Sequence, residues 1–382
     1  MPPELSLVGH PFAPIGMGEH IRCSFRALRS VAHKPALVDL YGLSDAAESG
    51  TLDLVPHASG DLGAINIFHI NADEVELAFA TLGDRIPSDA YNIIYPAWEL
   101  AIYPDAWIEI LNGFDEAWAP SAFIAMALRE KLNRPVVTMP LATEVLLDSF
   151  LSRRYFGIAE DAYVFLFFYD FRSFASRKNP RAIFHAFRRM LKNRPFCNAR
   201  LVIKSHGGSA DASAELLSEF EDIAARVTIL DRTMTDNEVK NLVRCSDAFI
   251  SLHRSEGFGR GMAEAMYLGK PVVATGYSGN LTFMTESNSH LVDFTLQALE
   301  PGSYPHWEGQ VWAEPDVEVA ANAMRRLIDH PEAGRELGRR ASADVRRHLS
   351  YRATGTRFIE RLESVRHNLS SRPIQYQIPR GW

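Results

Sequence analysis

The stretch that decides the fold is DAFISLHRSEGFGRGMAEAMYLGKPVVAT, residues 247–275. It starts with an apolar run, passes through a turn with three glycines, continues as a helical pattern and ends in a second apolar run at 270–275. Continuous apolar runs joined by a helix are typical of parallel strands that helices cover on both faces. The stretch therefore predicts a strand–helix–strand unit of an α/β sheet.

The same alternation extends over the chain. Before residue 150 we expect strands at LSLVGH, AINIFHI, YNIIYPA and PVVTMP, and helices at IRCSFRALRSVA and SAFIAMALREKL. After residue 150 we expect further strands at YVFLFFYDF, ARLVIKSH and RVTILD, helices at PRAIFHAFRRMLK and DNEVKNLVRC, and a helical stretch over 316–369. This doubled pattern predicts two Rossmann-like domains that face each other across a cleft.

Charge is unevenly distributed and marks the boundary between these domains. Residues 1–150 carry 8 Lys and Arg against 20 Asp and Glu, a net charge of −12, whereas residues 151–382 carry 32 against 27, a net charge of +5. We therefore expect an N-terminal domain at 1–150 and a C-terminal domain at 151–350 that handles an anionic ligand. A helix and tail at 351–382 could pack back on the first domain.

The composition of the 382-residue chain excludes several classes of protein. Its 47% hydrophobic and 23% charged content is that of a soluble globular protein, and no apolar run approaches the roughly 18 residues of a membrane span. The sequence begins without an export-signal pattern, and its three cysteines lack the pairing of a disulfide framework or a zinc site. We expect a cytoplasmic protein that does not bind nucleic acid, because the total charge is acidic.

Glu256 and Glu264 flank the glycine-rich turn of the opening stretch. Ligands of α/β sheets lie at the C-terminal ends of strands, so Glu256 should line the cleft and Glu264 should follow about two helical turns later on the same side. A helix N-terminus at 259–262 favours a phosphate, whereas a carboxylate accepts hydrogen bonds from sugar or ribose hydroxyls. The turn predicts a ligand with hydroxyl-rich ends and an anionic middle.

The segment EGFGRGMAE resembles the E-x7-E element of retaining glycosyltransferases of the GT-B fold, in the group called glycosyltransferase family 4, or group 1. The likeness extends to AMYLGKPVVAT, RKNPRAIFHAF, GMGEHIR, WAPSAF and WAEPD. It implies a hexosyltransferase with the acceptor in the first domain and a UDP- or GDP-sugar in the second. It also implies that Glu256 contacts the transferred sugar and Glu264 the ribose. The same turn could instead be only a tight connection between a strand and a helix.

Basic residues of the second half are candidates for binding the donor diphosphate. The resemblance places Lys178 of SRKNP on the diphosphate, with Arg172 or Arg177 as its partner. Lys204, at the end of a strand, is a further candidate, and each of these side chains could also be an ordinary structural or solvated residue. The rest of the expected donor site is in the glycine-rich turn and the loop after RVTIL: Phe258, Gly259, Gly261, Met262 and Thr233.

The first domain offers candidates in two loops. Gly16 and Gly18 of HPFAPIGMGEHIR allow a close approach of the backbone to a ligand, although a tight turn alone would also use them. Trp98 and Glu99 follow a strand where many relatives carry a histidine that faces the transferred sugar. Glu99 is the candidate here, and Trp98 could stack on a sugar or belong to the core. Two further strand-end candidates are His69 and Asp73.

The sequence contains no Asp-x-Asp triplet, the pair that holds a metal ion in sugar transferases of the other major fold. We therefore expect transfer without a metal ion or a cofactor, with Lys178, an arginine and helix N-termini supplying positive charge. The resemblance implies retention by front-face attack, in which the leaving phosphate accepts the proton of the acceptor.

Other functions remain open. A GT-B-fold epimerase or phosphorylase is one alternative, although a phosphorylase would usually be much longer, and a non-catalytic protein that binds a sugar nucleotide without turnover is another. An oxidoreductase is disfavoured because GMGEHI and GFGRGM lack the third glycine of a dinucleotide-binding loop. Relatives commonly build polysaccharides or glycolipids, so we expect a saccharide or lipid-linked acceptor. Basic helix faces could touch an anionic membrane or simply be solvated: Arg188, Arg189, Lys192, Arg194, Arg325, Arg326, Arg339 and Arg340.

Overall fold

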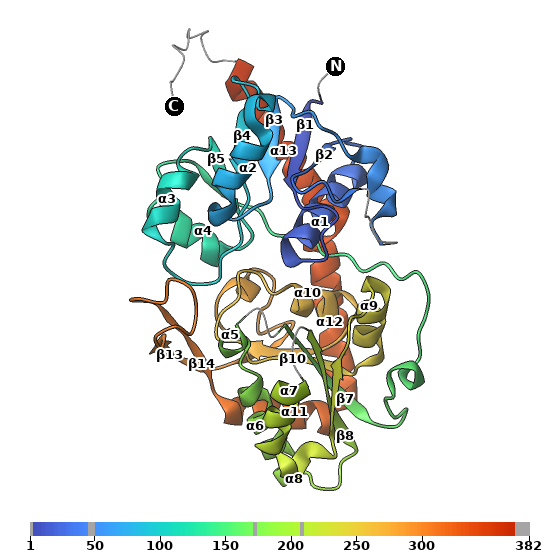
Figure 1. Ribbon diagram of the computed structural model, residues 1–382. Helices are drawn as coiled ribbons and strands as arrows, with labels where there is room; N and C mark the ends of the chain where they lie inside the picture. The colour runs from blue at the N-terminus through green and yellow to red at the C-terminus, as the bar shows by residue number, and fades with distance from the viewer. Residues whose placement is uncertain (1–2, 45–49, 171–173, 207–209, 371–382) are drawn as a thin grey trace.

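The computed structural model describes residues 3–44, 50–170, 174–206 and 210–370. Two six-stranded parallel sheets lie in separate halves of the molecule, each covered by helices (Figure 1). This arrangement confirms the predicted α/β class with two Rossmann-like units. Arg172 and the tail at 371–382 lie outside the described residues.

The first sheet has the strand order β2–β1–β3–β4–β5–β6, and every neighbouring pair is parallel. Its strands are β1 (Leu5–Gly9), β2 (Ala36–Asp39), β3 (Ile65–Phe68), β4 (Tyr91–Ile94), β5 (Glu116–Ala119) and β6 (Val136–Thr138). The connecting helices are α1 (Gly16–Ser30), α2 (Val75–Leu82), α3 (Asp105–Leu111) and α4 (Ala122–Arg129), with short 3-10 turns η2 (Leu52–His57), η3 (Ala72–Glu74) and η4 (Gly83–Arg85).

The second sheet has the order β12–β11–β10–β7–β8–β9, again with parallel neighbours. Its strands are β7 (Tyr163–Asp170), β8 (Ala199–His206), β9 (Val227–Asp231), β10 (Ala248–Ser251), β11 (Val272–Thr275) and β12 (His290–Val292). Its helices are α5 (Ala175–Lys178), α6 (Pro180–Asn193), α7 (Ala210–Ser218), α8 (Glu221–Ala224), α9 (Asp236–Cys245) and α10 (Arg260–Tyr267), with turns η5 (Arg153–Phe156) and η7 (Gly279–Thr282). The opening stretch is therefore β10–α10–β11, as predicted.

Strand β5 is one that the sequence pattern did not reveal, because its first residue is a glutamate. Glu116 is fully buried. Its carboxylate accepts hydrogen bonds from Tyr91 Oη at 3.0 Å and Trp118 Nε1 at 2.7 Å, and it forms an ion pair with Arg361. A buried carboxylate with this many partners can occupy a core strand, where hydrophobicity alone would exclude it.

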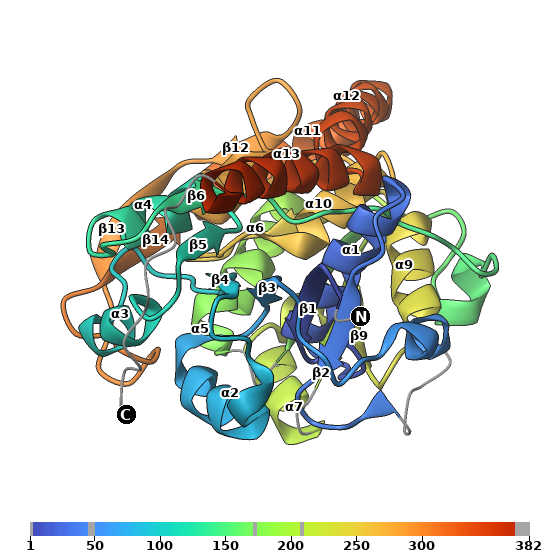
Figure 2. The same cartoon turned by 90° about the horizontal axis from the view of Figure 1, so that it is seen from above.

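The C-terminal region consists of the helices α11 (Val317–Asp329), α12 (Pro331–Leu349) and α13 (Tyr351–Ser370). Helix α13 returns to the first half and lies along α1 (Figures 1 and 2). Phe358, Leu362 and Val365 join the core beneath the first sheet. The two helices approach so closely at Gly355 that a Cβ there would overlap the Ala27 carbonyl oxygen.

An antiparallel hairpin, β13 (Phe294–Ala298) and β14 (Val311–Pro315), extends from the second half toward the first. Its residues Leu299, Tyr304 and Trp312 share a core cluster with residues of the first half. Gln310 also makes two hydrogen bonds to the main chain of Ile102, at 3.0 and 2.7 Å. The hairpin, which the sequence pattern did not predict, therefore connects the two halves beside the cleft.

Candidate active site

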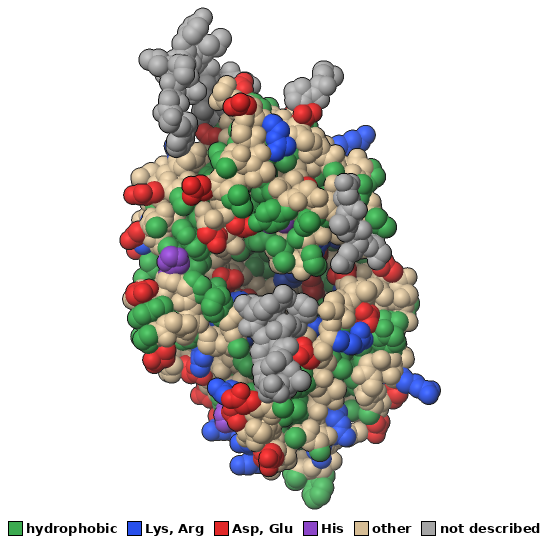
Figure 3. All heavy atoms as spheres, viewed as in Figure 1, with side chains coloured by type: hydrophobic (Ala, Val, Ile, Leu, Met, Phe, Trp, Pro, Cys, Tyr) green, Lys and Arg blue, Asp and Glu red, His purple; other side chains and the backbone are tan. Residues whose placement is uncertain are grey.

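The surface is hollowed between the two halves, and acidic and basic side chains lie within the hollow (Figure 3). Loops after β4, β7 and β10 meet there: Glu99 follows β4, Lys178 ends α5 after β7, and Glu256 follows β10. The contacts are close, because a Cβ at Gly257 would overlap the main-chain oxygen of Trp98 in the other half. The predicted strand ends thus converge at one place.

Arg177 and Lys178 lie on the one-turn helix α5, which two left-handed residues delimit. Phe174 before it has φ of 58° and Asn179 after it has φ of 52°, and Pro180 then begins α6. This sharp turn holds Arg177 almost fully buried, where its Nη1 donates to the Ser255 carbonyl oxygen at 2.9 Å. The RKNP segment therefore directs two adjacent cations, Arg177 and Lys178, toward Glu256, the residue after Ser255.

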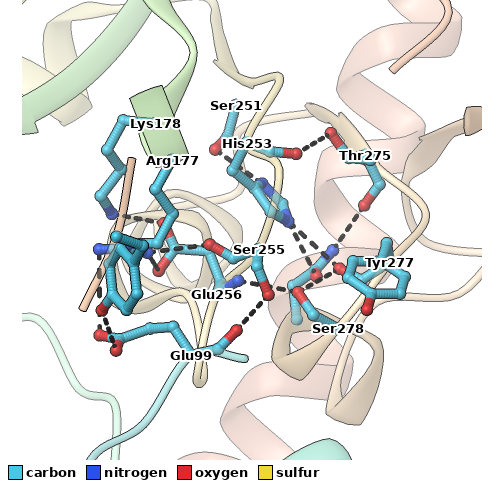
Figure 4. A network of polar contacts seen from close by, with 12 residues as sticks. Glu99, Arg177, Lys178, Ser251, His253, Ser255, Glu256, Thr275, Tyr277 and Ser278 are labelled. Carbon is cyan, nitrogen blue, oxygen red and sulfur yellow. Dashed lines mark hydrogen bonds and ion pairs between the residues drawn. The ribbon is translucent and has the colours of Figure 1, made fainter. Parts of the chain in front are cut away.

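The Glu256 carboxylate contacts both of these cations. Its Oε2 lies 3.2 Å from Arg177 Nη1, and its Oε1 accepts a hydrogen bond from Lys178 Nζ (Figure 4). Its main-chain N–H donates to Ser278 Oγ at 2.8 Å. Burial alone would raise the pKa of Glu256, but Lys178 and Arg177 lower it to about 2. Glu256 is therefore an ionised carboxylate held by fixed positive charges.

Glu99 reaches this cluster from the first half. Its Oε1 lies 3.9 Å from Arg177 Nη2, its Oε2 accepts a hydrogen bond from Tyr304 Oη at 2.6 Å, and its carbonyl oxygen accepts one from Ser255 Oγ. Trp98, by contrast, is buried among Tyr103, Trp107 and Tyr304 and donates its indole N–H to the Ile102 carbonyl. The structure thus brings Glu99 to the cluster and places Trp98 in the core.

The glycine-rich turn between the two glutamates is built for a tight strand-to-helix connection. Gly259 has φ of 93°, in the left-handed region, and a Cβ there would overlap the Met262 side chain. Phe258 and Met262 are buried in the core, and Gly261 packs against Phe249. The N-cap of α10 is Gly259, which has no side chain to cap the first turn, so the main-chain N–H groups there could meet a ligand.

Glu264 lies in α10 in a different environment. Burial raises its pKa to about 7, although Arg260 and Lys240 lower it. Across the described residues, its carboxylate has no hydrogen-bond partner. Arg260 extends from α10 to the first half, where its Nη1 lies 3.3 Å from Cys23 Sγ. The second glutamate therefore lacks the fixed partners that Glu256 has.

The remaining candidates differ in burial and in the space around their main chain. Lys204 is buried in β8 and donates to the Ser205 carbonyl oxygen, and Thr233 is exposed in the loop after β9. A Cβ at Gly18 would overlap the Ala13 carbonyl oxygen, whereas one at Gly16 would meet nothing within 4 Å. The loop conformation thus requires a glycine at position 18 and not at position 16. Arg172 cannot be placed, since it lies outside the described ranges.

Two strand-end candidates of the first half differ in exposure. His69 is fully buried beside His20 and Tyr95, and burial lowers its pKa to about 3. Asp73 is exposed in η3. His69 is therefore a neutral imidazole in the interior of the first half rather than an exposed charged group.

Sequence reasoning missed several residues around Glu256. His253 is buried, with its Nδ1 3.0 Å from Ser251 Oγ and its Nε2 3.2 Å from Asn280 Oδ1. Burial lowers the pKa of His253, so it packs behind the turn as a neutral group. Its place beside Glu256 in the opening stretch was an available signal. No comparable signal marked Tyr304.

Most arginines of the predicted basic faces have acidic partners. Arg188 pairs with Asp222 at 2.9 Å, Arg189 with Glu318 at 2.6 Å and Arg194 with Asp329 at 2.7 Å. Arg339 and Arg340 both lie near Glu336. Within the described ranges, no helix is long and apolar enough to cross a bilayer, and no three His, Cys, Asp or Glu side chains are grouped so that they could hold a metal ion.

Comparison with known proteins identifies relatives of this chain. A D-inositol 3-phosphate glycosyltransferase of Geodermatophilus obscurus is 29% identical over 162 residues, 41% of this chain and 35% of that protein. The aligned region thus spans about a third of this relative's length.

Solved structures resemble the chain over nearly its whole length. Sucrose-phosphate synthase from Thermosynechococcus elongatus matches with a TM-score of 0.68 and 13% identity, covering 96% of this chain and 100% of that one. HepE from Anabaena in complex with UDP-glucose matches with a TM-score of 0.67 and 14% identity, covering 95% and 100%. At this identity the likeness shows the GT-B fold. The family model described as glycosyl transferases group 1 matches residues 151–344, just over half of the sequence, and the chain therefore belongs to that family.

Proposed function

We propose that the protein is a retaining hexosyltransferase of the glycosyltransferase family 4 type. It moves a sugar from a UDP- or GDP-sugar to a saccharide or lipid-linked acceptor, as in polysaccharide or glycolipid synthesis. The observation that carries the proposal is the convergence of Lys178, Arg177 and Glu256 at the cleft, with Glu99 contributed by the opposite half. Two cations between two carboxylates suit a ligand with both phosphate and hydroxyl groups.

The donor diphosphate would exchange partners with Glu256. In the structure Lys178 and Arg177 neutralise Glu256. A diphosphate that draws these cations toward itself would release the carboxylate oxygens to accept hydrogen bonds from the hydroxyls of the transferred sugar. The N-terminus of α10 would add backbone N–H donors to the same phosphates. Donor binding would thereby prepare Glu256 for the sugar.

In the chemical step, the bond between the anomeric carbon and the phosphate oxygen breaks while the acceptor oxygen attacks from the same face. The leaving phosphate takes the acceptor's proton, so no protein nucleophile is required. Lys178 and Arg177 would stabilise the negative charge that grows on the phosphate, without a metal ion. Positioning by Glu256 and Glu99 would hold the sugar for front-face attack.

Glu264 would bind the ribose. A carboxylate can accept hydrogen bonds from both hydroxyls of a vicinal diol, and Glu264 offers one without an existing partner among the described residues. Thr233, in the loop after β9, would lie toward the base. Nucleotide recognition and sugar positioning would then depend on different glutamates.

Radiolabelled UDP- and GDP-sugars test the proposal. With EDTA present, the wild-type protein should release nucleoside diphosphate slowly by hydrolysis, and faster with a saccharide acceptor. Retention of configuration in the product would support the stereochemistry. Binding without turnover would instead favour a non-catalytic protein, and an isomerised sugar would favour an epimerase. Activity lost in EDTA and restored by Mn2+ would contradict metal independence.

A further inference from the structure

Among the described residues, the side chains that hydrogen-bond or ion-pair with the Glu99 carboxylate belong to the second half of the molecule. Tyr304 Oη donates to Glu99 Oε2 at 2.6 Å. Arg177 Nη2 lies 3.9 Å from Glu99 Oε1, which is beyond hydrogen-bond length. Glu99 therefore lies within ion-pair distance of Arg177 but too far for a hydrogen bond to it.

Tyr304 is itself fixed by the hairpin and by the residues around it. Its ring is buried, with ring centroids 5.9 Å from Trp98 and 4.8 Å from Phe174, and the Arg177 guanidinium lies 5.9 Å from its ring centre. The carbonyl oxygen of the preceding Ser303 accepts a hydrogen bond from Ser176 Oγ at 2.9 Å. The hydroxyl is thus presented to Glu99 from a fixed position.

We propose that Tyr304 is a positioning residue for sugar transfer: its hydroxyl holds the Glu99 carboxylate toward the transferred sugar and prevents it from closing on Arg177. A closer, hydrogen-bonded Glu99–Arg177 pair would take more positive charge from Glu256 and from the donor phosphate. The hairpin β13–β14 would thereby set the geometry of a residue in the opposite half. This inference rests on the proposed function.

Tyr304→Phe tests the role, and Tyr103→Phe is its matched control. Both tyrosines belong to the same aromatic core and both pack near Trp98. The Tyr103 hydroxyl, however, is buried and has no hydrogen-bond partner among the described residues. The two substitutions therefore remove the same group from similar surroundings, and only one of them removes a bond to Glu99.

UDP-glucose and GDP-mannose are the probes, with UDP and GDP as the binding controls. In Tyr304→Phe, kcat should fall about tenfold, as expected for loss of a hydrogen bond to a charged group, while nucleotide affinity changes less than about twofold. Tyr103→Phe should match the wild type. In a Glu99→Gln background, Tyr304→Phe should cause no further loss of kcat.

Wild-type kcat in Tyr304→Phe, or an equal loss in Tyr103→Phe, would overturn the proposal. Multiplicative losses in the double variant would overturn it as well. If the wild type turns over neither donor, the proposed function fails with these donors. The Tyr304–Glu99 contact is then tested separately, by a double-mutant cycle measured in denaturant unfolding. The Tyr304–Glu99 pair should then show a coupling of about tenfold in the folding equilibrium constant, and no coupling would overturn the positioning role.

Discussion

Glu256 and Glu264 lie on one strand-to-helix connection, yet their surroundings have opposite effects on ionisation. Burial opposes the charged form of both. Around Glu256, Lys178 and Arg177 overcome burial and lower the pKa to about 2. Around Glu264, Arg260 and Lys240 do not overcome burial, and the pKa rises to about 7. Fixed cations thus compensate the charge of Glu256, whereas those near Glu264 do not offset its burial.

Under the proposed function, this contrast would allow a single strand-to-helix connection to serve two ends of a ligand. A carboxylate that already has cations is rigid and ionised at any working pH. A half-buried carboxylate without hydrogen bonds gains most when hydroxyl donors arrive. We therefore assign Glu256 to the reacting end of the donor and Glu264 to the nucleotide end, and the following experiments test that division.

The largest expected effect is on the Glu256 side. Lys178→Met should lower kcat by about 10²- to 10³-fold, because it removes a cation from the leaving phosphate and from Glu256. Lys192→Met, at an exposed position on α6, is the matched control and should leave kcat unchanged. Steady-state kinetics with a turned-over donor provide the measurement. A normal kcat in Lys178→Met would contradict the proposed role of Lys178 in stabilising the leaving phosphate.

A smaller effect concerns folding. The folded-state pKa of Glu264 is raised from 4.5 to about 7, so its contribution to stability is greatest below pH 4.5 and is lost as the pH rises through 7. The free energy of unfolding of Glu264→Gln, minus that of the wild type, should therefore increase by about 2 kcal/mol when the pH is raised from 5 to 8.

Glu256→Gln should behave oppositely in the same denaturant titrations. The folded-state pKa of Glu256 is lowered to about 2, so the stability it contributes is present above pH 4.5 and is lost as the pH falls through 2. This variant should be less stable than the wild type at pH 7. If both variants shift in the same direction at pH 8, the electrostatic contrast is wrong.

The smallest expected effect concerns nucleotide affinity and pH. If ionised Glu264 accepts the ribose hydroxyls, affinity for UDP or GDP should rise about tenfold from pH 6 to pH 8, following deprotonation of a group with a pKa of about 7. Calorimetric titrations of Glu264→Gln over the same pH range are the control, because ionisation of the nucleotide phosphates affects both proteins. The argument fails if wild type and variant have the same pH dependence.

The fold could be predicted where apolar runs mark the strands and glycine-rich turns mark their connections. The stretch 247–275 forms β10–α10–β11 because its apolar strands and its turn are local features. The hairpin was not predictable, since every residue of β13 is exposed and no apolar run marks it. Strand β5 was hidden because Glu116 is stabilised by Arg361, far along the chain.

The site was predictable in part for the same reason. Lys178 and Glu256 follow strands of one sheet, so their proximity could be inferred from the parallel order of β7 and β10. The contact of Tyr304 with Glu99 depends on how the hairpin packs against the other half. Such a contact has no local pattern, because it arises only after both halves are assembled.

Calorimetric titration of UDP and GDP into Glu256→Ala and Glu264→Ala tests the central division most directly. Glu264→Ala should weaken nucleotide binding by about 1–3 kcal/mol, the range for hydrogen bonds to a charged group. Glu256→Ala should not weaken it, because its partners Lys178 and Arg177 remain for the diphosphate, although turnover should fall. Equal losses of nucleotide affinity in the two folded variants would contradict the account.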